Sequence, residues 1–192
     1  MKFISRAIFA TTLLLAAPAF AGDWKSIESE SSIAFGSVKK DTVGEVHHFN
    51  KVSGTVSESG ELKITIDLAS VETNIDIRNE RITNHVFQEG KATATLSGEI
   101  DIAEVNSMKI GETKIMEIEA NLSFIGIDNE IEANMLVARL GENRVLVTTS
   151  DFIMLSTEDL GINAGVDKLM ELAKLPSITR VTPIAARMVF EK

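Results

Sequence analysis

The segment from Leu62 to Phe87, LKITIDLASVETNIDIRNERITNHVF, decides the fold. Its first part places apolar residues at every second position up to Leu68, which is the pattern of a strand with one buried face. After the turn-forming residues 70–74, apolar side chains recur at helical spacing over 75–87. The segment therefore predicts a strand that leads directly into a short amphipathic helix. We expect this helix to lie across one end of whatever the strands enclose.

The two-residue period continues on both sides of this segment, with turn-forming residues between successive runs. The predicted strands cover residues 22–38, 43–56, 62–68, 92–102, 116–124, 131–137, 145–149 and 182–190. A second helix is predicted over 164–175, just ahead of Pro176. This spacing indicates an all-β sandwich or barrel. An eight-stranded antiparallel barrel with two short inserted α-helices is favoured, because closure leaves no long exposed strand edge.

The N-terminus has the pattern of a secretory signal peptide. A basic segment over residues 1–6 precedes an apolar run over 7–17, and Ala19-Phe20-Ala21 is a small-residue cleavage site. We therefore expect cleavage after Ala21 and export, in a bacterium to the periplasm. The mature chain, residues 22–192, has the length of a single domain.

Charge and composition exclude several classes of partner. Loss of Lys2 and Arg6 with the leader takes the formal net charge from −9 to −11, which disfavours binding to nucleic acid or to anionic membranes. No later stretch is apolar for long enough to span a bilayer, so stable membrane insertion is not expected. The chain contains no Cys and so no disulfide.

Three segments carry a resemblance to a known family. Residues 70–74 followed by 77–82 resemble the Ser-x-[DE]-T…R-D-x-H-L pattern of the exported, lipocalin-like YceI-like family. The turn at 126–129 resembles that family's G-V-T-x-P turn, and residues 158–162 look like its D-F-G-I segment. The order of signal, strands and helices is also similar, so the resemblance covers the whole mature chain.

This resemblance implies a barrel whose apolar lumen holds a polyisoprenoid or another long-chain amphiphile. The implied partner is thus a lipophilic small molecule, isoprenoid or fatty-acid-like. The chain differs from the family pattern at Asn79 (usually Asp), Arg81 (usually His), Lys39 (commonly His) and Glu130 (usually Pro). These differences concern the mouth of the barrel and the ligand head group more than the fold.

The inward faces of the predicted strands supply the candidate lumen. Its expected lining residues are Phe35, Ile64, Ile66, Leu96, Ile118, Leu122, Phe124, Met135, Val147, Ile184, Met188 and Phe190. Small residues on the same faces leave volume for a hydrocarbon tail, and these are Ala92, Ala94, Gly98, Ala120, Ala133 and Ala186. The alternative is that large side chains and the two helices fill this space.

Arg78 and Arg81 lie about one helical turn apart and share a helix face. They are the candidate rim for a phosphate or carboxylate head group. Alternatively they belong to a solvated face paired with Asp76, Glu80 or Glu72, and Arg78 ties the helix to the barrel.

No cofactor or metal is expected. His47 and His48 are adjacent on a predicted strand, so they point to opposite faces and are expected at the surface. Asp151, Glu158 and Asp159 provide carboxylates, but no nucleophile motif accompanies them, and we expect no enzymatic activity.

The sequence thus predicts a periplasmic binding or carrier protein for a polyisoprenoid or similar long-chain amphiphile, for example a quinone precursor. A stress-related structural barrel with a filled lumen is the alternative, and a hydrolase acting at the barrel mouth is a lesser one. A homodimer through strand edges remains open, since it would leave no clear mark in the sequence.

Overall fold

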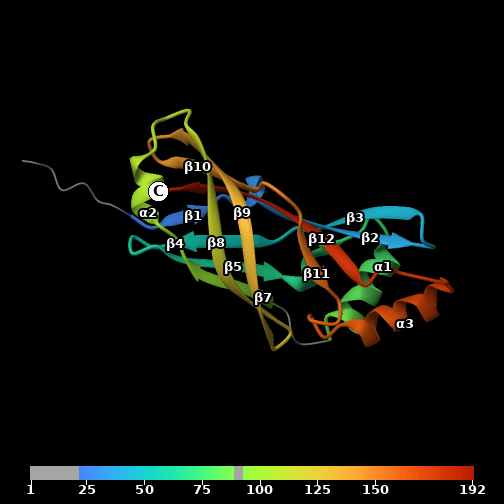
Figure 1. Ribbon diagram of the computed structural model, residues 1–192. Coiled ribbons are helices and arrows are strands. Elements are labelled where there is room, and N and C mark those ends of the chain that lie inside the picture. Colours follow the sequence, from blue (N-terminus) through green and yellow to red (C-terminus); the bar gives the residue numbers. More distant parts are fainter. Residues whose placement is uncertain (1–21, 89–92) are drawn as a thin grey trace, which may run out of the picture.

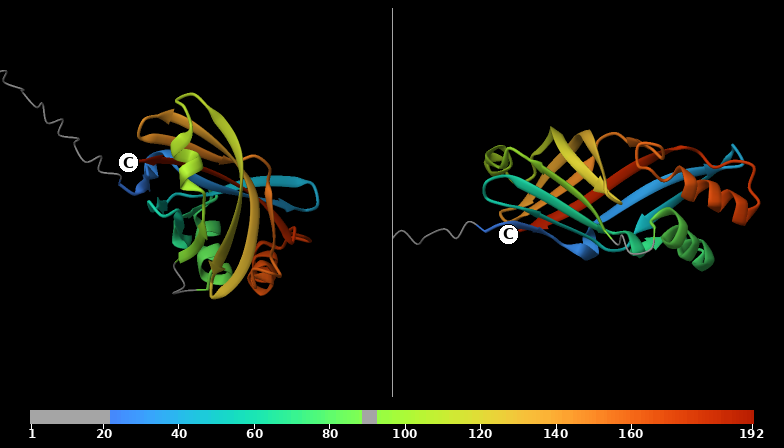
Figure 2. Two further views of the ribbon diagram at one scale, coloured as in Figure 1. Left: turned by 60° about the vertical axis from the view of Figure 1, so that its left-hand side comes forward. Right: turned by 90° about the horizontal axis from the view of Figure 1, so that it is seen from below.

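The computed structural model describes residues 22–88 and 93–192 of the chain. The predicted leader over 1–21 and the predicted inward residue Ala92 lie outside the described residues. Long strands wrap around one axis, with α2 and the C-terminus at one end and α1 and α3 at the other (Figure 1). The two further views in Figure 2 show the same division between the ends.

The described part of the chain is mostly antiparallel strand. The strands are β1 (Trp24–Ser26), β2 (Ser32–Lys39), β3 (Val43–Phe49), β4 (Val52–Val56), β5 (Glu61–Asp67), β6 (Val71–Glu72), β7 (Thr93–Glu99), β8 (Thr113–Phe124), β9 (Ile127–Gly141), β10 (Arg144–Thr149), β11 (Ile153–Ser156) and β12 (Val181–Glu191). The helical elements are the 3-10 turns η1 (Glu28–Glu30) and η2 (Leu68–Ser70), the α-helices α1 (Asp76–Arg81), α2 (Ile102–Ser107) and α3 (Asn163–Ala173), and the π-helical turn η3 (Ile82–Val86).

Eight of these strands form a closed barrel, as predicted. The ring runs β1, β4, β5, β7, β8, β9, β10 and β12, and the pairing of Lys25 with Glu191 closes it between β1 and β12. Strands β2 and β3 extend the wall at the end that carries α1 and α3, because β2 pairs with the first half of β12 and Ile184 lies opposite Phe35. Strand β11 pairs with the other edge of that half.

Two of the predicted strands are each divided in the structure. The predicted strand over 22–38 is β1 and β2, separated by the turn η1, and the predicted strand over 43–56 is β3 and β4, interrupted at Asn50 and Lys51. Each break allows a strand to change partner, since β4 pairs with β1 and β5 whereas β3 pairs with β2 and β6. A single period of two cannot describe either predicted strand, because the inward positions change from odd to even numbers between Phe49 and Val52, and from even to odd between Trp24 and Ile33.

The helices also differ in part from the prediction. The helix expected over 75–87 is the short α1 followed by the π-helical turn η3. The strand expected to reach residue 102 ends at Glu99, and α2 follows, with the Asp101 side chain accepting a hydrogen bond from the backbone N–H of Glu104. This N-cap stabilises a helix where the apolar alternation still fits a strand. None of the helices in the described residues is long and apolar enough to cross a membrane.

Helix α3 packs on η3 through a close backbone approach at Gly165. A Cβ atom at this position would lie 2.5 Å from the backbone oxygen of His85 and 2.7 Å from Cα of Val86. Glycine therefore lets the two helical elements meet across one end of the barrel, where they cover the interior that the strands enclose.

Candidate ligand-binding cavity

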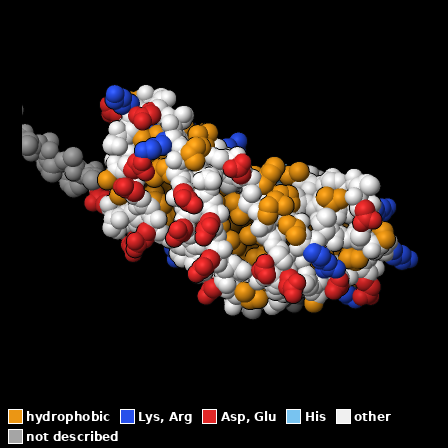
Figure 3. Space-filling view, viewed as in Figure 1, with side chains coloured by type: hydrophobic (Ala, Val, Ile, Leu, Met, Phe, Trp, Pro, Cys, Tyr) orange, Lys and Arg blue, Asp and Glu red, His pale blue; other side chains and the backbone are white. Residues whose placement is uncertain are grey.

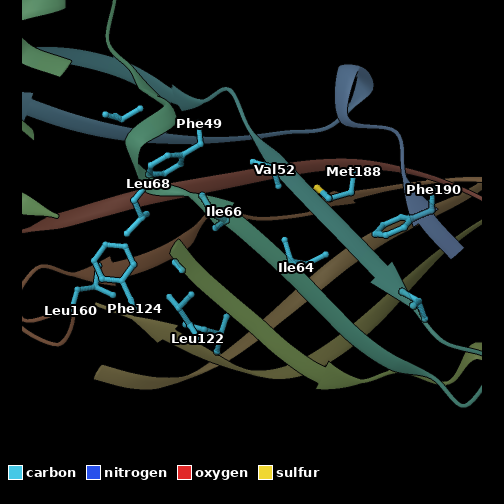
Figure 4. Packing of buried hydrophobic residues seen from close by; sticks show 14 of the residues in the cluster. Phe49, Val52, Ile64, Ile66, Leu68, Leu122, Phe124, Leu160, Met188 and Phe190 are labelled. Carbon is cyan, nitrogen blue, oxygen red and sulfur yellow. The ribbon is translucent and has the colours of Figure 1, made fainter. Parts of the chain in front are cut away.

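The barrel encloses one large apolar cavity of about 570 Å³. This volume lies within the range of roughly 300–1,000 Å³ that small-molecule sites occupy. Figure 4 shows side chains from opposite walls pointing into the same interior, with Phe49, Leu68, Phe124 and Leu160 toward one end and Met188 and Phe190 toward the other. The alternating pattern of the strands therefore builds a hollow interior as well as a core.

All twelve predicted lumen residues line this cavity, and so do Arg78 and Arg81. Other lining residues were not predicted from the strand pattern, among them Trp24, Ile82, Phe87 and Leu169. Trp24 belongs to the short strand β1, Ile82 and Leu169 reach the cavity from η3 and α3, and Phe87 directly follows η3. The position of a helix on the end of a barrel depends on tertiary packing. The only sign in the sequence that these residues line the cavity was therefore their apolar character.

The predicted small residues behave unequally. Ala186 lines the cavity. Ala94, Ala120 and Ala133 are at most 9% exposed and pack into the barrel wall without forming the cavity surface. At Gly98, an added Cβ would lie 2.7 Å from the backbone oxygen of Glu119, so this glycine allows β7 and β8 to lie close together. These small residues thus shape the wall as much as they create volume.

The polar side chains of the cavity gather near the β2–β3 hairpin and α1. Glu45 of β3 accepts hydrogen bonds from Lys39 Nζ at 2.9 Å and from Arg78 Nη1 at 2.8 Å. Burial acts to raise the pKa of Glu45, but the hydrogen bonds from Arg78 and Lys39 outweigh it and hold the pKa below its usual value. The cavity therefore has one mouth with a network of fixed charges.

A second set of hydrogen bonds fixes the start of α1. Arg78 Nη2 donates to the backbone oxygen of Thr73 at 2.6 Å. The Asn79 side chain accepts from the backbone N–H of Thr73 at 2.9 Å and donates to Glu72 Oε1 at 3.0 Å. Thus Arg78 does tie the helix to the barrel, through Glu45 rather than through Glu72, and Asn79 replaces a charged Asp with an amide that bonds in both directions.

Arg81 has a different environment from Arg78. Among the described residues, Arg81 takes part in no hydrogen bond or ion pair, although it lines the cavity. The predicted alternative of pairing with Asp76, Glu80 or Glu72 is therefore not what the structure has. The guanidinium remains available at the rim.

The expected surface position of His47 is wrong. His47 is only 3% exposed and lines the cavity, whereas His48 is exposed as predicted. The His47 ring packs against Phe35 with ring centroids 5.1 Å apart, and its Nε2 lies 3.0 Å from Ser37 Oγ. Because β3 extends the barrel wall, one of the two histidine side chains must point into the interior. The sequence alone does not tell which of them does so.

Burial lowers the pKa of His47 to about 4, and the positive charge of Arg78 contributes to the shift. The imidazole is therefore neutral at pH 7. In the described residues, no group of three or more His, Asp or Glu side chains could hold a metal ion.

The carboxylates considered for catalysis lie elsewhere. Asp151, Glu158 and Asp159 are exposed and do not line the cavity. Of the described residues that do line it, the charged or titratable ones are Lys39, Glu45, His47, Arg78 and Arg81.

Comparison with known proteins identifies the fold family. The family model described as the YceI-like domain matches residues 24–179. A polyisoprenoid binding domain from Saccharophagus degradans is similar in structure, with a TM-score of 0.86, 31% sequence identity, and coverage of 88% of this chain and 97% of that one. BcnA from Burkholderia cenocepacia has the same fold, with a TM-score of 0.65, 16% identity, and coverage of 85% and 98%. No curated protein matches the sequence.

The family match spans nearly all of the barrel, from β1 to the segment just before β12. The structural match to the Saccharophagus domain extends over most of both chains at a sequence identity above 30%. The chain therefore belongs to the YceI-like family, with a closed eight-stranded antiparallel barrel that encloses an apolar cavity.

Proposed function

We propose that this protein is a periplasmic carrier that binds a polyisoprenoid, or another long-chain amphiphile such as a quinone precursor, in its barrel cavity. The observation that carries the proposal is the apolar cavity of about 570 Å³ with its polar side chains gathered at one mouth. This arrangement suits a molecule with a long hydrocarbon tail and a small polar head. The name of the Saccharophagus relative, a polyisoprenoid binding domain, supports the same class of ligand.

Binding of this kind needs no chemical step. Each methylene group that leaves water for the lumen contributes roughly 0.8 kcal/mol, from which the cost of ordering the chain is subtracted. Affinity should therefore rise with tail length until the cavity is full. A carrier of this type takes up its ligand where the ligand is abundant and releases it where a competing membrane or enzyme binds the ligand more tightly.

The cavity also bears on the two alternatives. A structural barrel with a filled lumen would leave little space between the walls, and a cavity of this volume argues against it. A hydrolase at the mouth would need a nucleophile and a base together there. Asp151, Glu158 and Asp159 are on the outside, so this alternative has no support from the candidate residues.

The test is native mass spectrometry of the full-length protein expressed in and purified from a bacterial host, followed by organic extraction and lipid analysis. We expect a stoichiometric long-chain species in the periplasmic fraction, bound to a chain that begins at Gly22. A protein that carries no lipid, and that takes up no added prenyl lipid after delipidation, would overturn the carrier proposal. A bound protein that retains residues 1–21 would overturn only the proposed location.

A further inference from the structure

Two buried polar atoms at the mouth of the cavity have no hydrogen-bond partner among the described residues, and these are Nδ1 of His47 and Nε of Arg78. Both residues line the cavity. A buried polar atom left without a partner is destabilising, and a ligand that supplies the partner would relieve this cost. The hydroxyl side chains of the lining, Ser37, Thr157, Thr179 and Thr182, have partners within the protein, whereas the indole Nε1 of Trp24, which lines the cavity from β1, also has no partner among the described residues.

His47 lines the cavity, and Nδ1 is the nitrogen of its ring that has no partner among the described residues. Glu45 and His47 are two residues apart on β3 and share its inner face. Arg78 reaches that face from α1 through its hydrogen bond to Glu45. The Ser37 hydroxyl satisfies Nε2 of His47, and Nδ1 remains without a partner on a side chain that is 97% buried, since only 3% of the residue is exposed.

The available hydrogens define what this site can bind. The His47 ring is neutral at pH 7 and so carries one hydrogen. When the Ser37 hydroxyl donates to Nε2, that hydrogen lies on Nδ1, which is then a donor like Nε of Arg78. In this tautomer the site has two donors, which call for an acceptor, and oxygen is the acceptor that amphiphile head groups carry.

Charge decides between a neutral and an anionic oxygen. Among the described residues that line the cavity, three cations, Lys39, Arg78 and Arg81, face the single carboxylate of Glu45. Two positive charges are therefore uncompensated at the mouth, although the whole chain is acidic. Figure 3 shows acidic side chains spread over the face that it draws, and they are mixed with basic ones at the end that carries α1 and α3. Charge-assisted hydrogen bonds are about twice as strong as neutral ones.

We propose that His47 and Arg78 form a head-group subsite that binds an anionic oxygen, of a carboxylate or a phosphate, at the end of the aliphatic chain. Arg81 supplies the compensating charge at the rim. His47 and Arg78 each supply one donor to the head group, and the tail contributes the greater part of the affinity. This inference rests on the proposed function, since it concerns the head of a ligand whose tail fills the cavity.

The test compares head groups on matched tails. Delipidated mature protein is titrated by calorimetry with geranylgeranyl phosphate against geranylgeraniol, and with palmitate against hexadecanol. The variants are His47→Phe, which keeps a ring against Phe35 but removes both nitrogens, and His48→Phe on the outer face as the control. We expect the wild type and His48→Phe to bind the anion of at least one pair roughly tenfold more tightly than the alcohol.

In His47→Phe this ratio should fall several-fold but not to one, because one of the two donors is lost while the cations Lys39, Arg78 and Arg81 remain, and the affinity for the alcohols should fall less than that for the anions. Retained alcohol binding shows that the variant is folded and that its cavity is intact. A preference confined to one pair identifies the head as phosphate or as carboxylate. Equal ratios in His47→Phe and wild type, or no preference in the wild type, would overturn the subsite. Failure of the wild type to bind any of the four probes would instead overturn the carrier function itself.

Discussion

The Arg78 guanidinium donates a hydrogen bond to the Glu45 carboxylate across 2.8 Å, and this ion pair joins helix α1 to strand β3 at the mouth of the barrel. The two side chains are 22% and 21% exposed, so water screens the pair only in part. Glu45 also accepts from Lys39. One carboxylate thus holds two cations, and the helix position depends on it.

Replacement of Glu45 by Gln should destabilise the protein by about 1–2 kcal/mol, because it leaves two half-buried cations without their anion. The measurement is the free energy of unfolding in urea at pH 7. The control is Glu117→Gln on the exposed face of β8, which should change stability by no more than about 0.5 kcal/mol. Equal losses in the two variants would show that the pair contributes nothing beyond a surface charge.

The buried imidazole of His47 should make stability depend on pH. Its pKa is about 4 in the folded protein against 6.5 as the reference value, so the unfolded chain binds a proton first as the pH falls. The contribution of the neutral His47 ring to the free energy of unfolding is fully present above pH 6.5, and it is lost progressively as the pH falls to 4. By pH 5 the loss should be about 2 kcal/mol.

Urea unfolding at pH 7 and pH 5 measures this loss in the wild type, in His47→Gln and in the control His48→Gln. The difference between the two pH values should shrink in His47→Gln alone. Glu45 does not interfere in this window, because its pKa lies below the usual value and its own contribution is lost only at lower pH. An unchanged difference in His47→Gln would contradict the prediction.

An open cavity should accept a large side chain where a filled core would not. Leu96 lines the cavity from β7, so Leu96→Trp should cost less than about 1.5 kcal/mol and should abolish uptake of prenyl lipids. Ala94 lies on the same strand and the same face but is 0% exposed and does not line the cavity. Ala94→Trp should therefore cost about 3 kcal/mol or prevent folding. A loss as large in Leu96→Trp would mean that the lumen is filled.

Trp24 should report how far a ligand tail reaches. It is the single Trp of the chain, is 2% exposed, and lines the cavity from β1, at the end of the barrel away from the polar mouth (Figure 1). In a series of prenyl alcohols of increasing length, the emission of Trp24 should change only once the tail is long enough to contact the indole. If the shortest alcohol that binds changed the emission of Trp24 as much as the longest one, the ligand would not extend from the polar mouth toward Trp24 as proposed.

The contact between α3 and η3 should be sensitive to a single methyl group. Alanine normally favours a helix over glycine by up to about 1 kcal/mol, but a Cβ at Gly165 would meet backbone atoms that cannot rotate away. Gly165→Ala should therefore destabilise the protein by about 1–3 kcal/mol in urea unfolding. The control is Ala164→Ser on the exposed side of the same helix. A stabilising Gly165→Ala would show that the two elements separate easily.

Much of the barrel was predictable from alternation. The inward positions of Ile64, Leu96, Leu122 and Met188 follow from a period of two and a single buried face, because a strand in a barrel wall has no other way to bury its apolar side chains. The same rule accounts for all twelve predicted lining residues. It fails where one continuous strand is assumed across a change of partner, as at Asn50 and Lys51, because the inward positions shift there from 47 and 49 to 52, 54 and 56.

The sequence by itself determined the faces of most strands, the helical segments over 75–87 and 164–175, and the presence of arginines on α1. Only the tertiary structure decided that, within residues 22–88 and 93–192, the Arg78 side chain is paired while that of Arg81 is not, because Glu45 lies 33 residues away in the chain and reaches Arg78 only when β3 and α1 meet. It also decided that His47 rather than His48 enters the cavity. Local patterns depend on backbone geometry, which neighbouring residues set, whereas the chemistry of the mouth depends on contacts that exist only after the barrel has closed.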